Sequence, residues 1–108
     1  MNFVHQNLSE GRWFEMSLAE QLGNVGSEVE RAIRWRKKGD SEQSQKAFDR
    51  MLELLDLTLN DRRWRGPRLR ELARLREELC RILTDDDEDT SGIQNYFLYF
   101  GILARANK

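Results

Sequence analysis

The feature that most constrains the fold of this chain is the spacing of its apolar residues, which recur every three or four positions. In the first third of the sequence these residues are Phe14, Leu18, Leu22, Val25, Val29 and Ile33. Such spacing places side chains along one face of an α-helix, whereas apolar and polar residues alternate in a half-buried strand. One proline and seven glycines among 108 residues also supply little turn chemistry for an all-β fold. The chain is therefore predicted to be all-α.

Signals that start and stop helices divide this pattern into four segments. The first ends in a run of cations and a glycine, and Asp40, three residues before a glutamine, forms a capping-box variant that starts the second. Gly66–Pro67 starts the third, because the N–H that proline lacks would be unpaired in the first turn anyway. Thr90 or Ser91 caps the fourth.

The connections between these segments are about two to seven residues long, which is typical of antiparallel neighbours. We therefore predict an antiparallel up-down-up-down four-helix bundle that forms a single domain over residues 10–108. Residues 1–9 are predicted to be a flexible N-terminal arm. The acidic run over 85–89 is predicted to be a solvated connection near the cations that end the first helix.

Two glycines leave the path of the first helix open. Gly23 and Gly26 each weaken a helix interior, and a new helix could start at Ser27. The apolar register nevertheless runs from Leu18 to Ile33 without a slip, which favours one helix. The glycines then belong to a stripe of small residues, against which we expect the aromatic fourth helix to pack closely.

The sequence carries no membrane signal. No apolar run approaches the roughly 18 residues of a membrane span, and the N-terminus lacks the layout of a signal peptide. The lone Cys80 excludes an internal disulfide and fits a reducing cytosol. A cytoplasmic protein without membrane contact is expected.

The sequence holds few residues of the types that catalysis and metal binding require. An enzymatic role is therefore left open and is not favoured. His5 is the single histidine and lies in the predicted arm, where no fold holds it as a base. One histidine and one cysteine do not make a zinc site, and no glycine-rich phosphate loop is present.

Carboxylates on the second helix give one enzymatic alternative. Glu53-Leu54-Leu55-Asp56 resembles the second half of the Glu-x-x-Glu and Glu-x-x-Asp pattern with which MazG-like all-α nucleotide pyrophosphatases hold Mg²⁺. The first half is missing, because Glu28 and Glu30 point about 200° apart on a helix. A solvated helix face is the favoured interpretation, with no metal or cofactor, and Mg²⁺ on Glu53 and Asp56 is the alternative.

Arginine is concentrated in residues 62–81, which hold eight arginines and three acids. Arginine binds phosphate through its forked guanidinium, and tryptophan offers a surface on which bases stack. An antiparallel bundle would place this segment beside Arg12 and Arg105, so that one end of the molecule is basic. Pairing of the arginines with nearby acids, with the tryptophan covering the core, is the competing interpretation. The candidate phosphate or nucleic-acid contacts are Arg62, Arg63, Trp64, Arg65 and Arg68.

The fourth helix is too apolar for a monomeric bundle. From Tyr96 to Leu103 only Gly101 is not a large apolar or aromatic residue, and a helix that is apolar on all sides needs cover. Exposed apolar surface of this kind usually marks an interface, so we expect a homo-oligomer, most simply a two-fold dimer. The predicted interface residues are Leu54, Leu57, Leu98, Tyr99 and Ile102.

Several short stretches resemble small uncharacterised prokaryotic four-helix-bundle proteins: Trp13-Phe14, Gly23-Asn24-Val25-Gly26-Ser27, Leu54-Leu55-Asp56-Leu57-Thr58 and Tyr96-Phe97. The resemblance runs from about Arg12 onward and implies the fold and a bacterial or archaeal cytosolic setting, with no activity to carry over. The favoured hypothesis is a non-enzymatic, oligomeric interaction module. A phosphate-binding or nucleic-acid-binding accessory protein and the Mg²⁺-dependent pyrophosphatase are the alternatives.

Overall fold

A computed structural model of the chain describes residues 11–85 and 88–106. Within these ranges the chain forms a 3-10 turn, η1 (Arg12–Glu15), and four α-helices without any strand. The helices are α2 (Leu18–Lys37), α3 (Ser41–Leu59), α4 (Pro67–Leu83) and α5 (Ser91–Ala106). The prediction of an all-α four-helix fold is confirmed. The predicted arm over 1–9, with His5, lies outside the described residues, as does Lys108.

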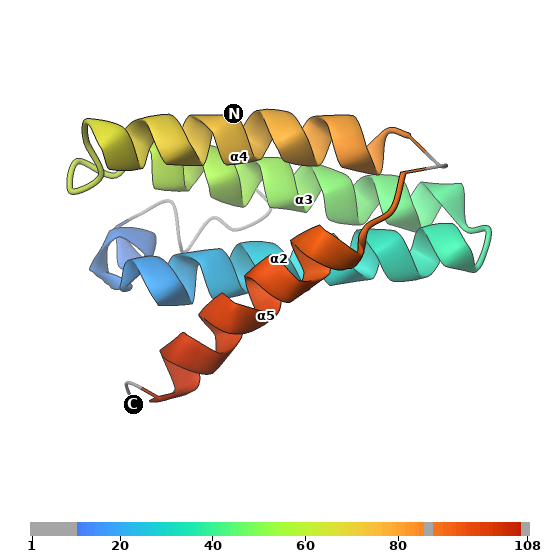
Figure 1. Cartoon of the computed structure of the whole chain (residues 1–108), viewed down its shortest axis with the longest axis horizontal. Helices are drawn as coiled ribbons and strands as arrows, with labels where there is room; N and C mark the ends of the chain where they lie inside the picture. Colours follow the sequence, from blue (N-terminus) through green and yellow to red (C-terminus); the bar gives the residue numbers. More distant parts are fainter. Residues whose placement is uncertain (1–10, 86–87, 107–108) are drawn as a thin grey trace.

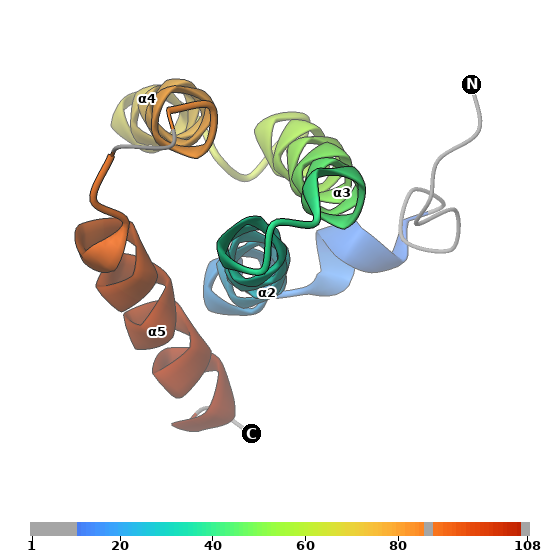
Figure 2. The ribbon, with the colours of Figure 1, turned by 90° about the vertical axis from the view of Figure 1, so that its right-hand side faces the viewer.

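The helices are arranged around α2 and α3. Figure 1 shows α2, α3 and α4 running alongside one another, while α5 crosses α2 obliquely. Seen end-on in Figure 2, α2 lies between α3 and α5, and α4 packs against α3. Helix α5 packs on α2 and not closely on α4. The last helix is therefore held along one side only.

Local signals set the helix ends. The Ser17 hydroxyl accepts a hydrogen bond from the Glu20 backbone N–H at 3.1 Å, and the Glu20 carboxylate accepts one from the Ser17 N–H at 3.2 Å. This capping box starts α2, and the helix continues unbroken through both glycines to Lys37. The apolar pattern alone had included Phe14 in the same helix, whereas Phe14 belongs to η1. At the start of α3 the Asp40 carboxylate caps the helix as predicted.

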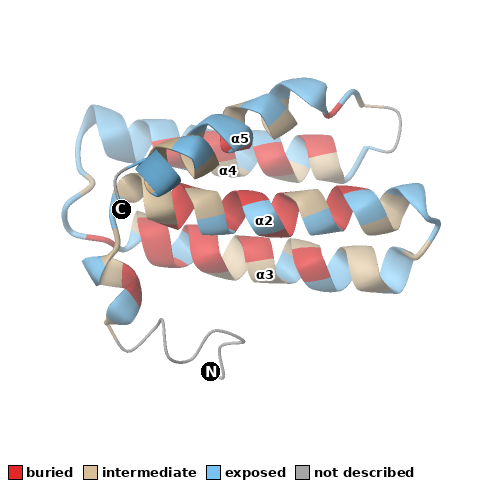
Figure 3. Cartoon of the chain, turned by 90° about the horizontal axis from the view of Figure 1, so that it is seen from below, coloured by how far each residue is buried: buried red, intermediate tan, exposed pale blue. Residues whose placement is uncertain are grey.

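The core lies between α2, α3 and α4, and Figure 3 shows buried residues along these helices while α5 is largely exposed. It is completed by the Trp13 ring of η1, which is fully buried. Leu54 and Leu57 also belong to this core, with 2% and 7% of their surface exposed. Their assignment to an oligomer interface was wrong, because α2, α4 and η1 all pack against α3 and leave it little free surface.

Helices α2 and α5 approach closely at the stripe of small residues. A Cβ atom added to Gly26 would lie 2.6 Å from the Cβ of Phe97, and one added to Gly23 would lie 3.8 Å from the Cα of Gly101. The first distance is shorter than a carbon–carbon contact allows. Because a Cβ atom moves only with its backbone, no rotamer change of Phe97 could relieve it. The expected packing of the aromatic helix on the glycine stripe is confirmed.

Substitution of Gly26 by alanine is therefore expected to destabilise the protein, although alanine favours a helix by about 1 kcal/mol over glycine. The matched control is Gly92→Ala in α5, where an added Cβ meets nothing within 4 Å. We expect urea unfolding to show a lower free energy of unfolding for Gly26→Ala and an unchanged or higher one for Gly92→Ala. The same sign for both variants would contradict the close helix crossing.

Candidate functional site

The tryptophan of the arginine-rich segment belongs to a buried polar network at the end of the bundle. The Trp64 indole N–H donates to Gln21 Oε1 at 2.8 Å. Gln21 is fully buried, and its amide donates to the Asp61 carboxylate at 2.9 Å and to the Trp13 carbonyl at 3.0 Å. The Trp13 indole N–H in turn donates to Thr58 Oγ1 at 3.1 Å. These bonds tie η1, α2 and the α3–α4 connection together.

Arg63 closes this network from outside. Its guanidinium lies 2.7 Å from an Asp61 carboxylate oxygen, donates to the Met16 carbonyl at 2.6 Å, and lies over the Trp64 ring at 4.5 Å. Burial of Asp61 raises the pKa of its carboxyl. This effect is outweighed by hydrogen bonds from Arg63 and Gln21 and by the positive charge of Arg63. Together they hold the pKa of Asp61 below its ordinary value. The side chains of Arg63 and Trp64 are therefore engaged in contacts within the chain, with Arg63 41% exposed.

The other predicted phosphate contacts are exposed. Arg68 forms an ion pair with Glu71 at 3.2 Å, and the Arg65 side chain donates to the Arg62 carbonyl at 3.0 Å. Neither Arg62 nor Arg65 forms an ion pair with any residue that the structure describes. Two further exposed arginines without such a partner, Arg70 and Arg74, were not among the predicted contacts. Because they are four residues apart on one helix, the sequence already indicates that Arg70 and Arg74 share one face of α4.

The outer face of α5 remains open. Leu98, Tyr99 and Ile102 have 57%, 59% and 50% of their surface exposed, as the sequence predicted for these three residues. On the inner face Phe97 is buried against α2. The rings of Tyr99 and Phe100 meet edge-on, with centroids 5.6 Å apart. The exposed residues are thus fixed on an ordered helix.

Two hollows flank this face. One, of about 440 Å³, lies between α4 and α5; its lining includes Leu75, Ile82, Ile93 and Tyr96 and, at its edge on α4, the charged residues Glu71, Arg74 and Glu78. The other, of about 360 Å³, lies over the close crossing of α2 and α5 and includes Leu98 in its lining. The exposed stripe of α5 is therefore a ridge between two depressions that are mostly apolar.

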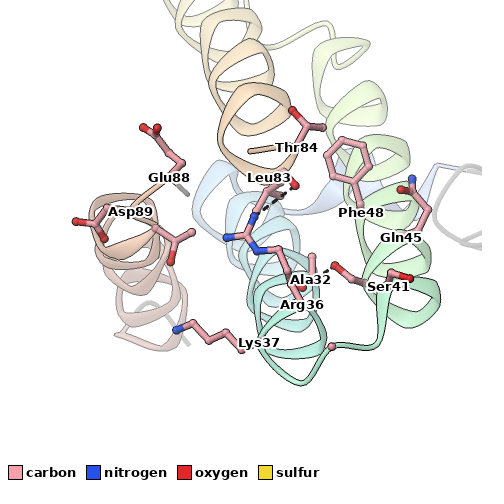
Figure 4. Close-up of a pocket in the computed structure, with 13 residues that line it drawn as sticks. Ala32, Arg36, Lys37, Ser41, Gln45, Phe48, Leu83, Thr84, Glu88 and Asp89 are labelled. Atoms are coloured by element: carbon pink, nitrogen blue, oxygen red, sulfur yellow. Dashed lines mark hydrogen bonds between the residues drawn. The ribbon is translucent and has the colours of Figure 1, made fainter. Parts of the chain in front are cut away.

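A larger pocket of about 680 Å³ lies at the opposite end of α2 (Figure 4). There the Arg36 guanidinium donates to the carbonyls of Ile82 and Leu83 at 3.4 and 3.5 Å, where α4 ends. Cations complement the carbonyl groups at a helix C-terminus. Of the acidic run, Glu88 pairs with Arg81 at 3.1 Å, and residues 86–87 lie outside the described ranges. Arg36 thus contacts backbone carbonyls at this end.

Two of the carboxylates considered for Mg²⁺ are paired with arginines. Asp56 is exposed and forms an ion pair with Arg76 of α4 at 2.9 Å, and Glu53 is half-buried. Glu28 is buried and lies between Arg31 at 2.6 Å and Arg50 at 2.9 Å. Among the described residues no group of three or more histidine, cysteine, aspartate or glutamate side chains could hold a metal ion.

Loss of the Gln21 amide should weaken the fold strongly. Gln21→Leu would leave the Asp61 carboxylate, the Trp13 carbonyl and the Trp64 N–H without this partner, which should cost about 3 kcal/mol. The control Gln45→Leu changes an exposed residue with one hydrogen bond to Asp49 and should shift stability by about 0.5 kcal/mol or less. Denaturant unfolding of both variants measures this difference. Equal effects would contradict the importance of the network.

The network should also make the stability of the protein depend on pH in the acidic range. Because the pKa of Asp61 is lowered by folding, its ionised form stabilises the protein above the unfolded pKa of about 3.9, and that stabilisation is lost as the pH falls through the folded pKa. Asp61→Asn should be less stable than the wild type at neutral pH and should lose less stability between about pH 5 and pH 2. Thermal unfolding across this range measures both effects. Parallel stability curves would rule out the contribution of Asp61.

Comparison with known proteins assigns no family to the chain. No family model, no curated protein and no solved structure matches it. None of the helices in the described ranges combines the length and apolar character needed to cross a bilayer. The function is therefore inferred from the surfaces described above.

Proposed function

We propose that this protein is a non-enzymatic interaction module that associates with a second copy of itself through the outer face of α5. The observation that carries this proposal is the exposure of Leu98, Tyr99 and Ile102, each at least half exposed, on one helix face. Clustered exposed side chains of this size usually mark an interface. The simplest closed assembly that covers such a face is a two-fold dimer.

The packing of α5 supports an interface rather than a loosely attached helix. Phe97 is wedged against Gly26, so the orientation of α5 on α2 is set by a close backbone approach. Leu98 and Ile102 are one turn apart and lie about 100° and about 140° around the helix axis from the buried Phe97. The apolar ridge is therefore presented in a defined geometry, which limits the entropy lost on association.

Charge favours a second copy of this chain as the partner. The only charged residue in the described length of α5 is Arg105, near its end. Two such ridges can therefore face each other without opposing like charges at the centre, and the polar Asn95 and Arg105 remain toward the rim. The hollow beside Tyr96 offers room for side chains of the other copy.

The engaged carboxylates support a role without catalysis. Asp56 is paired with Arg76, and Glu28 is held between two arginines, so their charges are compensated within the chain. We also infer a cytoplasmic location, for which the lone Cys80 is the supporting feature.

Sedimentation velocity at micromolar concentration tests the proposed dimer. The wild type should sediment with twice the 12.8 kDa mass of the chain. The double variant Leu98→Glu/Ile102→Glu should sediment as a monomer and keep its helical circular dichroism. The control Leu69→Glu alters a 37% exposed leucine on α4 and should remain a dimer.

A wild-type monomer would overturn self-association. A wild-type dimer that persists in the double variant would place the interface elsewhere on the molecule.

A further inference from the structure

The ion pairs of α4 are unevenly distributed along the helix. In its second half, Arg76 pairs with Asp56 at 2.9 Å and Arg81 pairs with Glu78 at 2.9 Å. In its first half and in the preceding connection, four exposed arginines form no ion pair with any described residue. They are Arg62, Arg65, Arg70 and Arg74. We refer to these four residues as the arginine surface.

The four arginines of this surface fall within residues 62–74, and all of them are exposed. Arg70 and Arg74 are one turn apart, about 6 Å along the helix axis, and lie on the side of α4 opposite the buried Leu72. Arg62 and Arg65 lie in the connection that leads into this helix. Positive charges at such spacing repel one another and oppose the positive end of the helix dipole, since the first turn of α4 holds no acidic residue.

We infer that the arginine surface binds the phosphate backbone of a nucleic-acid duplex. Guanidinium groups bind phosphate oxygens in a forked geometry, and several of them on an open surface suit a ligand with repeated phosphates. The net charge of −1 for the whole chain does not oppose this, because Asp61 and Glu71 of this region are paired with Arg63 and Arg68.

The contacts of Trp64 favour a duplex over a single strand as the ligand. Proteins that bind single strands stack exposed aromatic rings on the bases. Here the Trp64 indole is hydrogen-bonded to Gln21, and Arg63 covers its ring. The Trp64 ring is therefore engaged within the chain and is not free to stack on a base. Binding should depend on backbone charge alone, without sequence preference and with strong dependence on salt.

Fluorescence anisotropy with labelled duplexes of DNA and RNA tests this inference. We expect the double variant Arg70→Gln/Arg74→Gln to bind at least tenfold more weakly at low salt. Its slope of log K against log salt concentration should be smaller by about 2, since each lost phosphate contact removes about 0.9. The control Arg34→Gln/Lys37→Gln removes the same charge from exposed residues at the far end of α2 and should bind as the wild type does.

Several outcomes would overturn the inference. They are absence of binding to both duplexes at low salt, an equal loss in the control variant, and tighter binding to a single strand than to a duplex. Binding to vesicles of phosphatidylserine but not to duplexes would assign the surface to a membrane instead. The two proposals are measured separately, the dimer by sedimentation and duplex binding by anisotropy. Arg74 lines the hollow between α4 and α5, which is open in a monomer, so a monomeric Leu98→Glu/Ile102→Glu variant should still bind.

Discussion

The contact between Gly26 of α2 and Phe97 of α5 determines which surfaces this protein presents. The two backbones approach so closely there that any side chain on Gly26 would overlap Phe97. Helix α5 is thereby fixed across α2 and does not lie closely against α4. Because α2 covers only one side of it, the opposite side of an apolar helix faces outward. The missing side chain of Gly26 thus accounts for the exposed apolar ridge on α5.

A second constraint acts at the start of α2, where polar groups around Gln21 are buried. A buried carboxylate must be compensated, and Asp61 receives hydrogen bonds from both Gln21 and Arg63. The same requirement commits the indole N–H of Trp64 to Gln21. The end of the bundle is therefore closed by polar contacts, which engage the Trp64 N–H and the Arg63 guanidinium. Arg62, Arg65, Arg70 and Arg74 remain exposed and form no ion pair with a described residue.

Apolar and cationic surface are separated on different helices. The ridge of Leu98, Tyr99 and Ile102 belongs to α5, and the unpaired arginines belong to α4 and its preceding connection. In a two-fold dimer through α5 each copy would contribute one arginine surface. Two such surfaces on one particle would raise the affinity for a long duplex through effective concentration, without any new contact.

The sequence by itself determined the four helices, the cap at Asp40, the glycine stripe opposite an aromatic helix, and the exposed residues of α5, because these depend on local periodicity and side-chain size. The tertiary structure decided the rest. Leu54 and Leu57 are buried because α2, α4 and η1 all pack against α3, and η1 is a separate element because the Ser17 capping box starts α2 after it. Arg63 and Trp64 are engaged because the chain brings them to Asp61 and Gln21, the latter more than forty residues away from both in sequence. Burial and ion pairing depend on which elements meet, and periodicity along one helix does not contain that information.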